Sequence, residues 1–163
     1  MRASVYADGR FVLGTRTFRC ALGKGGIRAD KQEGDGATPV GVLPLRRVLY
    51  RADRGPAPDC AFAVEPIGPA DAWCEDPASR DYNRMIARAP DEAGDRLWRD
   101  DHLFDIVAVL GWNDAPVVRS RGSAIFLHLA RADYPPTDGC VALNMADLRA
   151  ALSAGLREIA VQG

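Results

Sequence analysis

The sequence predicts a mainly β protein with one helix near the C-terminus and a long irregular insertion in the middle of the chain. Three observations support this prediction. Short apolar or β-branched runs, separated by glycine and aspartate turns, occupy the first fifty residues. Prolines recur through residues 51–100 and exclude long helices over much of that stretch. Residues 145–156 have leucines at helical spacing and directly follow a capping asparagine, Asn144.

The N-terminal part is expected to form short strands. Pro39 and Pro44 place the last of them at a sheet edge or a strand start, because proline cannot donate to a ladder. The Gly-rich run 23–26 fits neither phosphate-binding pattern, so we interpret it as a flexible connection. The expected strands are Ser4–Tyr6, Phe11–Leu13, Thr17–Leu22 and Arg46–Tyr50.

The C-terminal part contains the most apolar segments. A nearly continuous apolar run predicts a central strand, and a second run predicts another buried strand. We expect the first to turn at residues 111–114 and continue through Val117 and Val118. The expected elements are the strands Leu103–Leu110 and Ser123–Leu129, the helix Met145–Leu156 capped by Asn144, and the strand Glu158–Val161.

Length and composition fit one globular domain, residues 1–163, with 47% hydrophobic and 26% charged residues. The formal net charge of −1 gives no support to a nucleic-acid partner. No apolar run is long enough for a membrane span, and the first residues do not have the pattern of a secretory leader. We expect a monomer.

Four cysteines are present, without a C-x-x-C pair, and the chain has two histidines. A zinc site would therefore need ligands from distant segments. We expect Cys20, Cys60 and Cys74 to be structural thiols. His102 is expected in a surface turn.

Cys140 has a setting that suits catalysis. His128 ends a predicted buried strand, and Cys140 follows it by twelve positions in a loop. An imidazole can take the proton of a thiol and generate the nucleophilic thiolate. Spacing alone leaves a second interpretation open, in which both residues are inert members of the core.

The residues next to the cysteine extend the catalytic hypothesis. Gly139 allows a tight turn, and the amides around Asp138, Gly139 and Cys140 could face a developing oxyanion. The group that orients the imidazole could be Asp133, Asp138 or a backbone carbonyl.

The segment from His128 to Val141 resembles the signature of the L,D-transpeptidase catalytic domain, the YkuD-like family. Thr137-Asp138-Gly139-Cys140-Val141 fits the Ser/Thr-x-Gly-Cys motif of that family. Thr38-Pro39-Val40-Gly41 resembles its Thr-Pro-x-Gly strand entry, and the segments 24–31 and 97–101 are also similar to one branch. The resemblance covers nearly the whole chain.

The resemblance implies a β-sandwich and a cysteine acyltransferase that acts on peptidoglycan stem peptides. Cys140 would form a thioester with a tetrapeptide donor and release D-alanine, and His128 would act as base and then acid. An amine acceptor would give a cross-link. No metal or organic cofactor is implied, and the implied substrate favours the periplasm or cell envelope.

The sequence departs from the family pattern at several positions, and these keep alternatives open. Asp138 replaces a frequent histidine, Ala142 replaces a frequent Arg or Asn, and Leu129 replaces a glycine. The alternatives are an L,D-carboxypeptidase or amide hydrolase on the same scaffold and a non-catalytic cell-wall-binding module. A carboxylate beside the thiol would raise the thiol pKa unless it points away or pairs with a base such as Arg131.

Three further residues are candidates for substrate binding. Arg131 and Tyr134 lie on the connecting loop and could hold a stem-peptide carboxylate, with a surface ion pair as the alternative for Arg131. Thr137 is the third candidate. Trp73, Trp98 and Trp112 are expected to pack in the core or in a lid.

Overall fold

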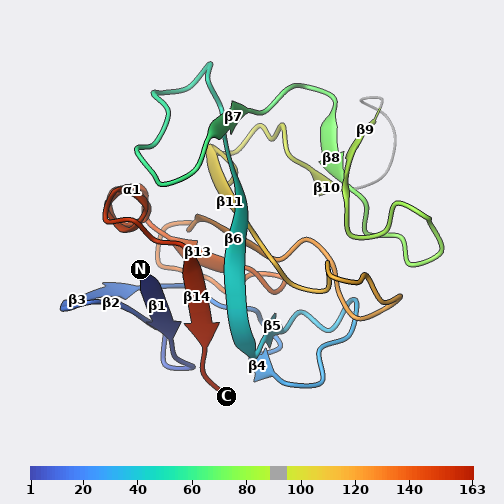
Figure 1. The fold of residues 1–163 in the computed structure, drawn as a ribbon, viewed down its shortest axis with the longest axis horizontal. Helices are drawn as coiled ribbons and strands as arrows, with labels where there is room; N and C mark the ends of the chain where they lie inside the picture. Colours follow the sequence, from blue (N-terminus) through green and yellow to red (C-terminus); the bar gives the residue numbers. More distant parts are fainter. Residues whose placement is uncertain (89–94) are drawn as a thin grey trace.

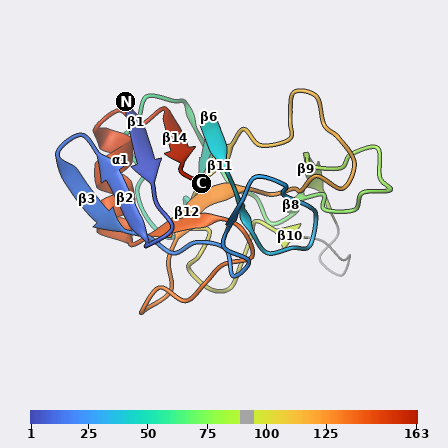
Figure 2. The same cartoon turned by 90° about the horizontal axis from the view of Figure 1, so that it is seen from below.

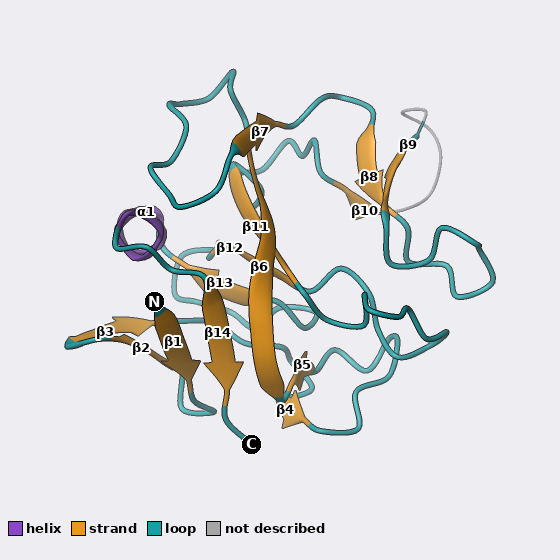
Figure 3. Cartoon of the chain, in the orientation of Figure 1, coloured by secondary structure: helices purple, strands orange, loops and turns teal. Residues whose placement is uncertain are grey.

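The described residues, 1–88 and 95–163 of a computed structural model, form a mainly β fold with one helix near the C-terminus. Strands and loops make up most of the molecule (Figure 3). The predicted fold class is therefore confirmed. Residues 89–94, part of the expected insertion, lie outside the described residues.

A nine-stranded sheet forms the centre of the molecule (Figure 1). Its strand order is β13-β12-β11-β6-β14-β1-β2-β3, and β7 pairs with β6 off this path. The strands are β1 (Arg2–Val5), β2 (Arg10–Leu13), β3 (Arg16–Arg19), β6 (Gly41–Tyr50), β7 (Val64–Pro66), β11 (Ile106–Leu110), β12 (Phe126–Leu129), β13 (Val141–Leu143) and β14 (Glu158–Val161).

The long strand β6 belongs to both halves of this sheet. Its residues 41–44 pair with β14, and its residues 45–50 pair with β11. At the other end, Ala21 just beyond β3 forms a bridge with Ala142 of β13. The two ends of the sheet therefore meet, and its two halves enclose a common core, as expected of a sandwich.

The strand β11 separates two hydrophobic clusters because successive side chains point to opposite faces of a strand. Ile106, Ala108 and Leu110 pack in the principal core between the two halves of the sheet. Val107 and Val109 pack in a second cluster, which contains Trp73 and Leu97 of the insertion together with Phe104. The insertion thus covers the outer face of β11 and β12.

The one helix in the described residues, α1 (Met145–Ser153), begins where the sequence predicts. The Asn144 side chain accepts a hydrogen bond from the Asp147 amide, at 2.8 Å, and so caps the helix. The helix ends three residues earlier than expected, because Gly155 turns the chain at a φ of 90°. Leu156 is nevertheless fully buried in the core.

The insertion contains short elements, as expected. A small sheet of order β10-β8-β9 lies at the opposite end of the molecule from β1–β3 (Figure 2). Its strands are β8 (Asp71–Trp73), β9 (Met85–Ala87) and β10 (Asp95–Arg96).

Outside the insertion, β4 (Ile27–Arg28) and β5 (Thr38–Pro39) form a separate two-stranded sheet.

Several parts of the expected strands are wrong. Val117 and Val118 lie in an irregular loop, and residues 103–105 form a turn before β11. Residues 123–125 are irregular before β12, and residues 20–22 lie beyond the end of β3. The first error has a physical reason, because the side chain of Asn113 bonds the backbone at Val118 and holds a closed loop in place of a strand.

No helix among residues 1–88 and 95–163 is long and apolar enough to cross a membrane.

Candidate active site

His128 and Cys140 come together because β12 and β13 are parallel neighbours. His128 lies within β12, opposite Ala142 of β13, and Cys140 directly precedes β13. On β12, His128 occupies the same face as Phe126, so its ring points toward the second hydrophobic cluster and the insertion. Two segments that are separate in the sequence thus present both groups to one side of the sheet.

The loop before Cys140 is fixed by two threonines. The Thr137 hydroxyl accepts a hydrogen bond from the Gly139 amide at 3.1 Å and donates to the Cys140 carbonyl at 2.7 Å. The fully buried Thr38 donates to the Gly139 carbonyl at 2.8 Å and accepts from the Gly23 amide at 2.9 Å. The Thr137 hydroxyl therefore binds the amide of Gly139, and the Thr38 hydroxyl binds its carbonyl.

Gly139 is required in this loop for two reasons. Its φ of 137° lies in a region that residues with a side chain rarely adopt, and a Cβ atom there would lie 2.8 Å from the Ala37 carbonyl oxygen. Its amide already bonds Thr137, so the prediction of an oxyanion site rests on the remaining amides of the loop.

The tautomer of His128 follows from its hydrogen bond. Nδ1 lies 2.9 Å from the backbone carbonyl oxygen of Leu129, and a carbonyl only accepts, so Nδ1 carries the proton. The neutral ring therefore has its lone pair on Nε2. Burial lowers the pKa of His128 to about 4, against the opposing effect of the Leu129 hydrogen bond. An edge-on contact with Phe104, at 5.2 Å between ring centroids, also holds the ring.

The Cys140 thiol forms hydrogen bonds with the backbone of residues 124–126, at the start of β12. Its Sγ donates to the Ala124 carbonyl at 3.2 Å and accepts from the Phe126 amide at 3.3 Å. Burial raises the pKa of the thiol to about 12, and the Phe126 amide opposes this shift. No hydrogen bond joins the thiol to His128 in the described residues, so both groups are neutral in this resting arrangement.

Both side chains line a cavity of about 450 Å³. Its wall carries charges of both signs, from the Gly-rich connection, the insertion and the loop before Cys140. The charged lining residues are Lys24, Lys31, Glu33, Glu75, Asp95, Arg99, Arg131 and Asp138.

Two acidic groups of the insertion have unusual protonation. Burial, with the nearby charge of Asp95, raises the pKa of Glu75 to about 7, although this side chain keeps contact with solvent. Burial raises the pKa of Asp95 to about 6. The cavity therefore loses negative charge as the pH falls below neutrality.

The structure places Asp138 away from the expected partner. Its exposed carboxylate pairs with Lys24 at 2.9 Å, whereas Arg131 lies 3.4 Å from Asp101. Asp138 therefore pairs with a base, one of the two possibilities considered, and that base is Lys24 and not Arg131. The reason is the bridge between Gly23 and Thr137, which brings the Gly-rich connection beside this loop.

The remaining candidates are distributed as follows. Arg131 and Thr137 line the cavity, whereas Tyr134 is outside its lining and accepts a hydrogen bond from Asn144 at 2.9 Å. The imidazole is oriented by a backbone carbonyl, which was one of the three expected possibilities; Asp133 is exposed and Asp138 is directed to Lys24.

Some site residues escaped the sequence analysis. Lys24 stood in a run interpreted as a flexible connection, and Thr38 was noted only within the Thr-Pro motif. Glu75 and Asp95 gave no sequence signal, because their distance from Cys140 along the chain hides their position in the cavity wall. In the described residues, no group of His, Cys, Asp and Glu side chains could hold a metal ion.

A comparison with protein families identifies the family of this chain. The family model of the L,D-transpeptidase catalytic domain, YkuD, matches residues 1–154. The chain therefore belongs to the L,D-transpeptidase catalytic domain family.

Among solved structures, the chain is similar to L,D-transpeptidase 1 of Mycobacterium tuberculosis, with 13% sequence identity and a TM-score of 0.43. The match covers 99% of this chain and 60% of that chain, so the present chain spans less than two thirds of that protein's length. A search among curated proteins finds no significant match.

Proposed function

We propose that this protein catalyses cysteine-dependent acyl transfer on peptidoglycan stem peptides, with Cys140 as nucleophile and His128 as base and then acid. One observation carries the proposal: a thiol and an imidazole whose free lone pair is on Nε2 line the same cavity. Family membership supports an enzyme of this class.

The chemistry follows from the protonation states. Because the thiol pKa is about 12 and the imidazole pKa about 4, a stable thiolate–imidazolium pair is unfavourable before substrate binds. The thiol must therefore turn from the Ala124 carbonyl toward Nε2 and lose its proton as Sγ attacks the donor carbonyl. In this scheme, deprotonation and attack are coupled.

The subsequent steps return each proton. The tetrahedral intermediate collapses, the bond to the terminal D-alanine breaks, and His128 gives its proton to the departing amine. An amine of a second stem then attacks the thioester, loses its proton to His128, and expels Cys140, which is reprotonated. With water as the nucleophile, the same steps give a shortened stem and no cross-link.

The charges of the cavity support a stem peptide as the substrate. Such a peptide carries both carboxylates and an amine, and the wall offers four basic and four acidic side chains. Arg131 is suited to a carboxylate of the donor, since its guanidinium is exposed and its pairing with Asp101 is long, at 3.4 Å. We propose that Thr137 shapes the loop that binds the substrate. Tyr134 lies outside the lining of the cavity, and we propose that it contacts only those parts of the substrate that extend beyond the cavity.

The experiment uses purified tetrapeptide-containing muropeptides and mass spectrometry of the products. Cross-linked dimers would support transpeptidation, and tripeptide monomers alone would support the carboxypeptidase alternative. Unchanged substrate without an acyl adduct on Cys140 would refute both and favour a binding module. Cys140→Ala should abolish turnover, whereas Cys60→Ala, at a half-buried cysteine outside the cavity lining, should retain it.

A further inference from the structure

The carbonyl that holds the Cys140 thiol belongs to a residue with an unusual backbone. Ala124 has a φ of 55°, in the left-handed region that residues with a Cβ atom rarely adopt. It is buried and directly precedes the segment that enters β12. Such a conformation persists when surrounding contacts over-determine it, and it is a frequent feature of functional sites.

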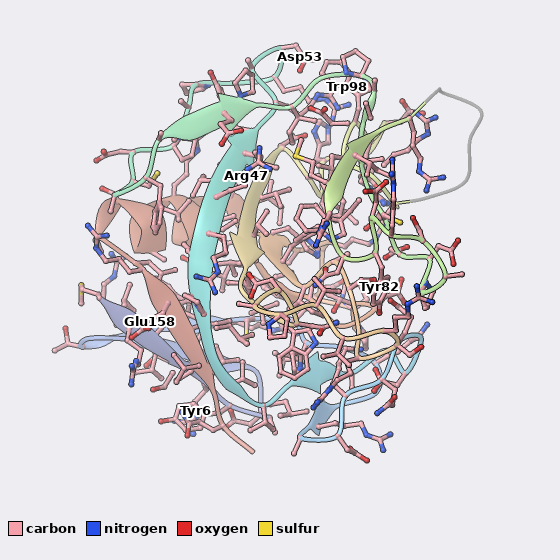
Figure 4. All side chains as sticks on the ribbon, turned by 45° about the vertical axis from the view of Figure 1, so that its right-hand side comes forward. Tyr6, Arg47, Asp53, Tyr82, Trp98 and Glu158 are labelled. Atoms are coloured by element: carbon pink, nitrogen blue, oxygen red, sulfur yellow. The ribbon has the colours of Figure 1, made fainter. Side chains whose placement is uncertain are left out.

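The contact that fixes Ala124 comes from the insertion. The side chain of Asn83 accepts a hydrogen bond from the Ala124 amide at 3.1 Å. The same oxygen accepts from Trp73 Nε1 at 2.9 Å, and the Asn83 Nδ2 donates to the carbonyls of Trp112 and Asn113, each at 2.8 Å. The neighbouring Tyr82, labelled in Figure 4, adds a further tie by accepting from the Gly122 amide at 3.0 Å.

The four hydrogen bonds of the Asn83 side chain, to Ala124, Trp73, Trp112 and Asn113, use the full capacity of its amide, namely two lone pairs and two N–H groups. A flipped amide would place its N–H groups against two donors and its oxygen against two carbonyls. Asn83 is only 6% exposed, so water does not offer an alternative set of partners. Its orientation is therefore unique, and the Ala124 amide has one fixed acceptor.

We propose that Asn83 is a positioning residue for Cys140. Its amide holds Ala124 in the left-handed conformation, and that conformation fixes the position of the carbonyl oxygen that accepts the hydrogen bond of the thiol in the resting protein. The inference rests on the proposed function only in taking Cys140 as the nucleophile. It assigns to the insertion a role in the state of the thiol, beyond covering the outer face of β12.

The direction of the effect follows from the two partners of Sγ. The Ala124 carbonyl can only accept, so it favours the protonated thiol and repels a thiolate. The Phe126 amide can only donate and favours the thiolate; it is anchored in β12, which pairs with β11 at Val109. Loss of Asn83 should release Ala124 but leave Phe126 in place, so the thiol should ionise more easily.

The other titratable groups around the thiol stay constant in this comparison. Asp95 in β10, Glu75 after β8 and Asp138 in the loop before Cys140 each raise the thiol pKa. His128 lines the same cavity. A substitution at residue 83 leaves all four side chains unchanged.

The test is the pH dependence of Cys140 alkylation by iodoacetamide, followed at the Cys140 peptide by mass spectrometry. Asn83→Gly is the informative variant, because Asn83 itself has a φ of 56° and glycine keeps that backbone while removing the amide. We expect the alkylation midpoint to move down by about half a pH unit or more, which is about a threefold faster reaction at neutral pH.

A matched control separates positioning from loss of stability. Val161→Ala truncates a buried side chain in β14, which is separated from β12 in the sheet by the strands β11 and β6. It should lower the melting temperature without moving the alkylation midpoint. An unchanged midpoint in Asn83→Gly, or an equal downward shift in Val161→Ala, would overturn the proposal.

A second pair of variants tests the backbone link. Glycine at position 124 adopts the left-handed region without strain, so adding Ala124→Gly to Asn83→Gly should return the midpoint at least halfway to that of the native protein. An equal shift in the single and double variants would contradict the role of Ala124.

Asn83→Asp keeps the test decisive if Asn83→Gly does not fold. Aspartate retains an acceptor for the Ala124 amide and adds a negative charge, so its midpoint should equal or exceed that of the native protein. A downward shift in this variant would refute the proposal. Alkylation needs no substrate, so these outcomes are independent of any failure to turn over muropeptides.

Discussion

Thr38 offers the sharpest test of how the fold holds the loop of Cys140. Its fully buried hydroxyl connects the Gly23 amide to the Gly139 carbonyl, at 2.9 and 2.8 Å. Thr38→Val replaces the hydroxyl by a methyl group of similar size, so packing is nearly conserved. What changes is that one buried donor and one buried acceptor lose their partner.

The expected loss of stability comes from those two groups. Each buried polar group left unsatisfied costs roughly 1–3 kcal/mol, so the variant, with two such groups, should lose roughly 2–6 kcal/mol of unfolding free energy. For a chain of this size, that corresponds to a melting temperature lower by roughly 4–24 °C. A domain with about 10 kcal/mol of unfolding free energy, the middle of the typical range, would still fold after this loss.

The assay is urea denaturation together with the rate of Cys140 alkylation. Thr38→Ser keeps the hydroxyl and should lose much less stability than Thr38→Val. Thr17→Val, on the exposed position of β3, is the matched control and should change the free energy of unfolding by less than about 0.5 kcal/mol. If Thr38→Val were no less stable than Thr17→Val, the bridging hydroxyl would not stabilise the loop and the reasoning would fail.

Three further predictions concern the same site. Gly139→Ala should destabilise the protein by at least about 2 kcal/mol in urea denaturation, because the added Cβ would meet a backbone carbonyl oxygen at 2.8 Å and φ is 137°; full stability would contradict the close approach. The depressed pKa of His128, about 4 against 6.5 unfolded, contributes stability that is complete above pH 6.5 and is lost as the pH falls to about 4, roughly 3 kcal/mol in all. Native protein should therefore lose more stability over this window than His128→Phe, and equal losses would refute the burial effect. Lys24→Ala should barely change stability, since its pair with Asp138 is exposed, but it should slow alkylation of the thiol at low salt by freeing that negative charge; a rate unaffected by the substitution would argue against this coupling.

The surroundings of Arg51 show how the two ends of the insertion are held together. Its guanidinium stacks on Trp98 at 3.6 Å from the ring centroid and bonds the Asp53 carboxylate at 2.8 Å. Figure 4 shows Asp53 and Trp98 close together beyond the end of β6. The Arg51 amide also donates to the Asp105 carbonyl, just before β11, at 2.9 Å. These contacts hold both ends of the insertion beside the strands β6 and β11, which favours the proposal that residues 1–163 act as one domain.

The sequence alone determined the features that depend on local pattern. Alternating or continuous apolar runs predicted β11 and β12, and Asn144 with Leu148 and Leu152 predicted α1, because periodicity and capping act within a few residues. The Thr-x-Gly-Cys motif led to the family, which the match over residues 1–154 then showed.

Only the tertiary structure decided which side chains surround the thiol. Asn83, Glu75 and Asp95 lie far from Cys140 along the chain, and the packing of the insertion against the outer face of β12 brings them to the site. The same holds for the Lys24–Asp138 pair. The physical reason is that long-range packing and left-handed backbone, such as that of Ala124, are set by the sum of many distant contacts, and such sums leave no short pattern in the sequence.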